Sequence, residues 1–254
     1  MSAAAGRRVP PLPAGAVHVY QASLDEPDVP LSRLEPLLTP EEREWVRRLR
    51  FERDRRRYAV GRLWLRWLLA AHLGAALAEI RFHEGLYGKP ALAGPGDVRG
   101  LRFSASYSGE LGLFALARDI EVGVDVERVR DDVDVEQIAA SLFAQGERAA
   151  LRRLGGQVRI RAFFTCWTRK EAYVKALGVG LSLPLDSFDV SAGLERGRLP
   201  DGFSISGPAG AWSLGDVDVA AGYAAAIAVE GHTPRVPREA APIDGPLVAV
   251  LGIE

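Results

Sequence analysis

The sequence predicts an α+β protein made of two similar halves, each a small antiparallel sheet with packed helices. A strand at Val17–Ala22 is followed by helical segments and short strands, and the same order begins again near residue 120. Gly and Pro turns separate the short strands, as in antiparallel sheets. A length of 254 residues accommodates one large domain or two modest ones. We therefore expect a pseudo-twofold molecule with a ligand site between its halves.

The N-terminal half is expected to span residues 1–119. Thr39-Pro40-Glu41-Glu42 supplies an N-cap, a proline at the first helical position and acids in the first turn, so a helix should run to about Leu49. A second helix is predicted over Arg53–Leu73, where large apolar residues recur. The strands expected here are Val17–Ala22, Ile80–His83, Ala91–Ala93, Phe103–Ser106 and Leu111–Ala117.

The C-terminal half is expected to span residues 120–232, with a Pro-rich extension over 233–254. No repeat is visible between the two halves, so their similarity is inferred from the order of elements alone. The expected elements are a strand at 120–126, helices at 135–144, 146–154 and 160–177, and strands at Phe188–Ser191, Trp212–Val219 and Tyr223–Val229.

The amino-acid composition indicates which classes of protein this chain can belong to. Hydrophobic residues make up 48% and charged residues 26%, which is typical of a globular chain with a real core. A net charge of −1 argues against a protein that coats nucleic acid. The single cysteine, Cys166, allows no internal disulfide and fits a reducing compartment. No apolar run is long enough for a membrane span and no secretory leader is visible, so we expect a cytoplasmic protein.

Two short acidic motifs indicate the chemistry. Asp125 and Glu127 lie two apart in a predicted strand and so share one face, while Glu171 and Lys175 lie one turn apart on a predicted helix. An Asp-x-Glu pair is most often only a solvated strand end. Here, however, the carboxylates are set among large apolar residues, and buried carboxylates need a cation or hydrogen-bond donors. The pattern favours a Mg²⁺ site that engages phosphate groups.

These residues resemble the signature motifs of a known family. The segments Gly123–Glu127 and Trp167–Lys175 are similar to the two signatures of the 4′-phosphopantetheinyl transferases. The length and the two halves resemble the monomeric, surfactin-synthetase-activating type. Further matches, in family order, are Tyr87-Gly88-Lys89-Pro90, Phe103-Ser-Ala-Ser106-Tyr107-Ser108 and Gly180-Leu-Ser182-Leu-Pro184-Leu-Asp186-Ser-Phe188.

The resemblance implies a reaction and its residues. The enzyme would move 4′-phosphopantetheine from coenzyme A to a serine of an apo acyl- or peptidyl-carrier protein and release adenosine 3′,5′-bisphosphate. Asp125, Glu127 and Glu171 would hold Mg²⁺, or Mn²⁺ in its place, against the pyrophosphate. Glu171 would accept the serine proton, directly or through a metal-bound water, and Lys175 would contact the pyrophosphate as a point charge. Asp125, Glu171 and Lys175 are the expected catalytic residues.

The resemblance also places the nucleotide of coenzyme A. It maps Gly88, Lys89 and Pro90 onto a loop lining the adenine, Arg57 onto the 3′-phosphate pocket and Ser106-Tyr107 onto a coenzyme A contact. In the family a histidine is common where this chain has Tyr107, and a tyrosine brings no positive charge near neutral pH. Lysines common in the first helix are replaced by Glu42 and Trp45. Both departures weaken the implied 3′-phosphate pocket.

The sequence also suggests how a carrier protein would be recognised, and it leaves two alternative functions open. Carrier proteins are acidic around their serine, so a basic and apolar rim would suit them. One alternative is another Mg²⁺-dependent phosphate-transfer enzyme, although no Gly-x-x-x-x-Gly-Lys-Ser/Thr loop is present. The other is a non-catalytic relative that binds coenzyme A or a carrier protein. Candidate rim residues are Leu142, Phe143, Arg148, Arg152 and Arg153; Leu142 and Phe143 fit equally well as core residues.

Overall fold

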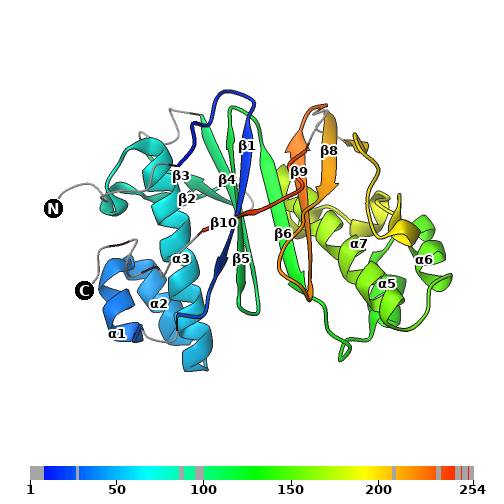
Figure 1. Ribbon diagram of the computed structural model, residues 1–254, viewed down its shortest axis with the longest axis horizontal. Coiled ribbons are helices and arrows are strands. Elements are labelled where there is room, and N and C mark those ends of the chain that lie inside the picture. The colour runs from blue at the N-terminus through cyan, green and yellow to red at the C-terminus, as the bar shows by residue number, and fades with distance from the viewer. Residues whose placement is uncertain are drawn as a thin grey trace.

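Two four-stranded sheets lie face to face at the centre of the molecule, and helices cover their outer faces (Figure 1). The computed structural model describes residues 9–26, 29–85, 89–94, 100–207, 210–232, 236–243, 247 and 251. The first sheet has the strand order β10-β1-β5-β4 and the second has the order β6-β9-β8-β7. The prediction of an α+β fold with two similar halves is confirmed.

Each half contributes its own helices. The elements of the first half are β1 Val17–Ser23, α1 Leu31–Leu34, α2 Pro40–Arg48, α3 Glu52–Leu73, β2 Phe82–Glu84, β3 Pro90–Leu92, β4 Leu101–Ser108 and β5 Leu111–Arg118. Those that follow are β6 Val122–Arg128, α5 Val135–Leu142, α6 Gln145–Arg152, α7 Gly156–Leu177, β7 Ser204–Gly207, β8 Gly210–Asp216, β9 Tyr223–Glu230 and β10 Ala241–Pro242.

The alternation of side chains along the strands creates the layers. On β5, Leu113 and Ala115 face the second sheet, whereas Phe114 and Leu116 join the core beneath α3. On β6, the even-numbered valines from 122 to 126 enter the core between the sheets. The odd-numbered residues of β6 therefore face the side on which α7 packs, and this places Asp125 and Glu127 beside that helix.

Local signals fix the helix ends. Thr39 caps α2 through the backbone N–H of Glu42, and the Glu42 carboxylate accepts a bond from Thr39 N–H in return. The 22-residue helices α3 and α7 both stop at a glycine in the left-handed conformation, Gly74 and Gly178, which costs glycine no steric strain. None of the described helices is long and apolar enough to cross a membrane.

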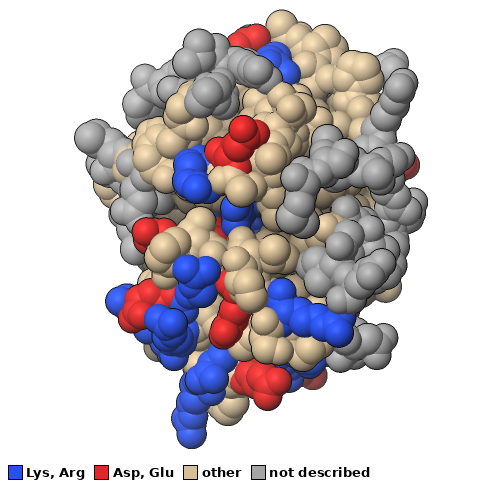
Figure 2. Space-filling model, turned by 90° about the vertical axis from the view of Figure 1, so that its left-hand side faces the viewer, with Lys and Arg blue, Asp and Glu red and all other residues tan. Residues whose placement is uncertain are grey.

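The arginine-rich surface of α2 and the start of α3 is interleaved with acids. Arg47 and Arg48 both form ion pairs with Glu44, and Arg53 pairs with Asp54. Figure 2 shows blue and red side chains mixed over the lower part of this face. Most of these arginines therefore form a solvated face rather than a phosphate-binding cluster.

One predicted strand is wrong, and two observed strands, β7 and β10, were not predicted. The segment Phe188–Ser191 forms no strand, because side chains occupy its backbone groups: Glu147 accepts from Val190 N–H, and Arg169 donates to Val190 O. The fourth strand of the second sheet is β7 instead. Its sequence, Ser-Ile-Ser-Gly, is too short and polar for its pattern to indicate a strand.

The C-terminal segment crosses back to the first half. β10 pairs in parallel with β1, with Tyr20 opposite Ala241, and Ile243 N–H donates to Gln21 O. Farther on, Leu247 is fully buried in the core beneath α3. The extension therefore supplies both a strand and a core side chain to the N-terminal half.

Shortening this buried side chain should destabilise the whole fold. We expect Leu247→Ala to lower the free energy of unfolding by about 2–5 kcal/mol, because a buried leucine leaves a cavity when truncated. Urea denaturation followed by tryptophan fluorescence measures it. Val158→Ala, at a side chain that is 61% exposed, is the control and should change stability by less than about 0.5 kcal/mol. Equal effects of the two changes would mean that Leu247 does not belong to the core.

Candidate active site

The predicted catalytic residues meet where β4 lies beside β6. These are edge strands of different sheets, and α7 packs against β6 from the other side. Asp125 Oδ1 accepts bonds from Ser106 Oγ at 2.7 Å and from Lys175 Nζ at 2.6 Å, and Lys175 Nζ also lies 3.0 Å from Ser106 Oγ. Residues from three elements are thus brought together at one carboxylate.

The other two predicted carboxylates lie near Asp125. Glu127 accepts a bond from Ser108 Oγ at 2.7 Å. Burial raises the pKa of Glu171, and the neighbouring charges of Asp125 and Glu127 raise it further. Burial likewise raises the pKa of Asp125 and of Glu127, although Lys175 opposes the change at Asp125 and Ser108 opposes it at Glu127. The three carboxylates therefore repel one another in a poorly solvated place.

This cluster fits a hard cation. Asp125 Oδ2 is buried and has no hydrogen-bond partner among the described residues, which is costly for a carboxylate oxygen. Carboxylate oxygens are the ligands that Mg²⁺ prefers. In the part of the chain that the structure describes, no three acidic, histidine or cysteine side chains are already gathered around one point. A cation held by all three carboxylates would therefore require side-chain rearrangement.

The signature segment on α7 divides into two faces. Arg169 donates two bonds to the Asp216 carboxylate, and Lys170 forms an ion pair with Glu147 in which both side chains are fully buried. These residues anchor the helix inside the C-terminal half. Glu171 and Lys175, one turn apart, line a cavity at the junction of the halves. One face of α7 thus anchors the helix, and the other face carries the candidate catalytic residues Glu171 and Lys175.

A glycine permits the close approach of β6 and α7. A Cβ at Gly123 would overlap the backbone atoms Ala172 O and Ala176 N of the helix. The first motif therefore needs glycine for packing, two residues before its first carboxylate. This contact brings Asp125 within reach of Lys175.

The junction cavity has a volume of about 340 Å³ and receives residues from both halves. Lys89, Pro90 and Tyr107 line it on the N-terminal side, together with Arg62. Lys89 Nζ donates to Glu121 Oε2 and to the carbonyls of Val122 and Ala176, so its charge ties the halves together. The predicted nucleotide contact Gly88 lies outside the described residues.

Arg57 lies elsewhere. It lines a larger groove of about 1080 Å³ on the other side of Tyr107, and it donates two bonds to the Asp25 carboxylate at 2.7 and 2.8 Å. The arginine that lines the junction cavity is Arg62, which also pairs with Glu42 and stacks over the Phe82 ring. The role of Arg57 in binding the 3′-phosphate stays a prediction.

Tyr107 stands between the groove and the junction cavity and lines both. Its ring packs edge-on to Phe114 and against Gly61, where an added Cβ would meet the ring at 2.6 Å. Burial raises the pKa of Tyr107, so its hydroxyl remains neutral. The positive charge in the junction cavity comes instead from Arg62, Lys89 and Lys175.

The residues predicted to form a carrier-binding rim differ in how far they are buried. Phe143 is 1% exposed and stacks on Phe163, so it belongs to the core. Arg148 and Arg152 line a smaller pocket between α5, α6 and the start of α7, and Arg153 is exposed and pairs with Glu195. Leu142 is half-buried. Only the arginines and Leu142 therefore remain available to a partner.

Sequence reasoning missed several residues of this site. Ser108 and Arg62 touch or line it, and Arg169 and Lys170 anchor its helix. The alternation Ser104-x-Ser106-x-Ser108 is a period-two signal that places three hydroxyls on one strand face. Sequence alone offers no such signal for Arg62, which lies in an arginine-rich helix.

Family models and known proteins agree with this architecture. A model described as the 4′-phosphopantetheinyl transferase superfamily matches residues 121–228, and one described as 4′-phosphopantetheinyl transferase, N-terminal, matches residues 29–118. The chain is 33% identical over 216 residues to 4′-phosphopantetheinyl transferase HetI of Nostoc sp., which covers 85% of this chain and 88% of that protein. It is 32% identical over 168 residues to 4′-phosphopantetheinyl transferase Sfp of Bacillus subtilis, covering 64% and 72%.

A mammalian protein is also similar. The L-aminoadipate-semialdehyde dehydrogenase-phosphopantetheinyl transferase of Mus musculus is 30% identical over 164 residues, which cover 61% of this chain and 53% of that protein. Fold, site and relatives together define an enzyme that transfers a phosphopantetheinyl group. The chain belongs to the 4′-phosphopantetheinyl transferase superfamily.

The contact between β6 and α7 is testable. We expect Gly123→Ala to lower the free energy of unfolding by about 3 kcal/mol, because the added methyl group must push the helix off the strand. Thermal and urea denaturation measure the loss. Gly155→Ala is the control, since a Cβ there would meet nothing within 4 Å. If the two variants are equally stable, the close approach at Gly123 is not a packing constraint.

Proposed function

We propose that the protein transfers 4′-phosphopantetheine from coenzyme A to a serine of an apo acyl- or peptidyl-carrier protein, with Mg²⁺, and releases adenosine 3′,5′-bisphosphate. The observation that carries the proposal is the cluster of the buried Asp125 with the half-buried Glu127 and Glu171 beside Lys175. These groups lie next to a cavity that both halves line. Family membership identifies the group that is transferred.

The reaction forms one bond and breaks another. The carrier serine Oγ attacks the phosphorus that bears pantetheine, and the bond from this phosphorus to the bridging oxygen of the pyrophosphate breaks. The adenosine bisphosphate leaves with the bonding electron pair, and the serine gives up its proton. Glu171 is suited to accept that proton, because its carboxylate lines the junction cavity.

The remaining polar groups position and neutralise phosphate. Lys175 is a compact charge, one third exposed, that reaches both Asp125 and the cavity. Ser106 holds Asp125 in place from β4. Mg²⁺ held by Asp125, Glu127 and Glu171 would neutralise the pyrophosphate and the developing negative charge of the leaving group.

Arg62 is suited to the 3′-phosphate of coenzyme A. Its guanidinium lines the junction cavity, whereas that of Arg57 lines the groove; each is paired with a carboxylate, Arg62 with Glu42 and Arg57 with Asp25. A guanidinium fork binds phosphate well, and the neutral Tyr107 beside it adds no charge.

Comparison of the two arginines tests this assignment. We expect Arg62→Gln to raise the KM for coenzyme A about tenfold and leave kcat nearly unchanged, because a hydrogen bond to a charged group is lost. Dephospho-coenzyme A, which lacks the 3′-phosphate, should show no such change. Arg57→Gln is the matched variant and should have the smaller effect. The reverse ranking would assign the 3′-phosphate to Arg57.

The carrier protein is expected to meet a basic surface of the C-terminal half. Arg148 and Arg152 lie on α6 at the pocket next to α5, and carrier proteins carry negative charge around their serine. Reversing these charges should slow association more than it changes the chemical step.

The transfer itself is tested by intact-mass spectrometry. An apo carrier protein incubated with coenzyme A, Mg²⁺ and this enzyme should gain the mass of one phosphopantetheinyl group on its serine. We expect a chelator to abolish the gain, and Asp125→Asn to reduce the rate by at least about 100-fold, because the buried carboxylate contributes to electrostatic stabilisation of the transition state.

Controls make the outcome decisive. Asp186→Asn, at an exposed carboxylate in the turn after α7, should retain the wild-type rate. A mass gain that survives both the chelator and Asp125→Asn would contradict the proposed site. No gain on any of several carriers, from an enzyme that still binds coenzyme A, would contradict the proposed acceptor.

A further inference from the structure

One face of β4 is polar along its whole length and lies against β6. Its odd-numbered residues, such as Leu101 and Phe103, enter the core beneath α3. Its even-numbered residues face the second half: Arg102 pairs with Glu121, and three serines follow at positions 104, 106 and 108. The two halves are thus joined along this edge by side chains.

The spacing of Ser104 and Ser108 on β4 matches the spacing of two backbone N–H groups on β6. Because β6 is an edge strand, alternate backbone N–H groups point away from β9. Ser104 Oγ accepts from Val124 N–H at 3.1 Å, and Ser108 Oγ accepts from Arg128 N–H at 3.0 Å. Two hydroxyl groups four residues apart therefore accept from two N–H groups four residues apart on the free edge of β6, where backbone carbonyls of a neighbouring strand would otherwise do so, and Ser106 between them bonds Asp125 instead.

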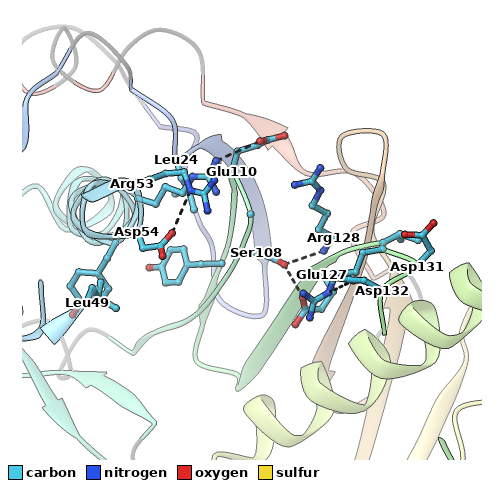
Figure 3. A pocket seen from close by; sticks show the side chains of 16 residues that line it. Leu24, Leu49, Arg53, Asp54, Ser108, Glu110, Glu127, Arg128, Asp131 and Asp132 are labelled. Atoms are coloured by element: carbon cyan, nitrogen blue, oxygen red, sulfur yellow. Dashed lines mark hydrogen bonds and ion pairs between the residues drawn. The ribbon is translucent and has the colours of Figure 1, made fainter. Parts of the chain in front are cut away.

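Ser108 makes a second bond that Ser104 does not. Its hydroxyl accepts from Arg128 N–H and donates to Glu127 Oε2 at 2.7 Å (Figure 3). The accepted bond fixes the position of the oxygen, so its proton has a defined direction toward the carboxylate. Glu127 is only half-buried and would otherwise choose among several rotamers.

We propose that Ser108 is a positioning residue that fixes the carboxylate of Glu127 for the divalent cation. The inference rests on the proposed function, since it concerns the cation that the carboxylate cluster would hold. Ser108 engages Oε2 and orients the carboxylate from the neighbouring strand β4. Outer partners of this kind orient the ligands of metal sites, and their loss weakens metal binding.

Variants of Ser108 and Ser104 form a matched pair for testing this proposal. Ser108→Ala removes both a strand contact and a carboxylate contact. Ser104→Ala removes the corresponding contact on Val124 N–H, which is buried whereas the contact of Ser108 on Arg128 N–H is exposed, and it removes no hydrogen bond to a carboxylate among the described residues. Ser108→Thr keeps the hydroxyl and adds a methyl group at the groove that Ser108 lines.

The experiment measures Mn²⁺ binding rather than turnover. Mn²⁺ is titrated into the full-length protein with coenzyme A present and no carrier, and free Mn²⁺ is followed by electron paramagnetic resonance. We expect Ser108→Ala to raise the Mn²⁺ dissociation constant about 10- to 100-fold. Ser104→Ala should change this constant by less than about twofold although it lowers the melting temperature, because it removes an acceptor of a buried N–H group. Ser108→Thr should restore the wild-type constant.

The outcomes separate two kinds of failure. In one outcome, the wild-type protein binds Mn²⁺, Asp125→Asn does not, and Ser108→Ala and Ser104→Ala have equal Mn²⁺ dissociation constants. This outcome would overturn the positioning role of Ser108 but would support the cation site. Mn²⁺ binding that Asp125→Asn does not weaken would overturn the cation site and the positioning role together. A Ser108→Thr variant as weak as Ser108→Ala would also contradict the role of the hydroxyl.

Discussion

The arrangement of the site depends on the buried carboxylate of Asp125. A carboxylate that is 3% exposed is costly unless charge and donors surround it, and here Ser106 and Lys175 reach it from β4 and α7. Its second oxygen still has no partner among the described residues. A single polar group therefore requires the two halves and one long helix to be placed correctly relative to one another.

Packing supplies that placement. The two sheets share an apolar core, and α7 lies directly on β6 because Gly123 has no side chain. Arg169 and Lys170 fasten the same helix to Asp216 and Glu147 on its inner side. Breaking either buried pair would leave an uncompensated charge, so the helix has little freedom to move away from the site.

The sequence predicted the α+β layers of the fold, and it singled out Asp125, Glu127, Glu171 and Lys175, which the structure brings together; their roles stay predictions. Period-two and helical patterns located most of the strands and long helices, and the N-cap Thr39 followed by Pro40 marked the start of α2. The strand expected near Val190 was wrong because side chains from α6 and α7 take its backbone bonds, a long-range effect that local pattern does not contain. For the same reason the pairing of Arg57 with Asp25, 32 residues away, could not be foreseen.

The most direct test is a crystal structure of the protein with coenzyme A and Mn²⁺, using anomalous scattering to locate the metal. The account predicts one strong peak among the carboxylates of Asp125, Glu127 and Glu171, with the pyrophosphate beside Lys175. A peak remote from these carboxylates, or coenzyme A bound away from the junction cavity, would contradict it.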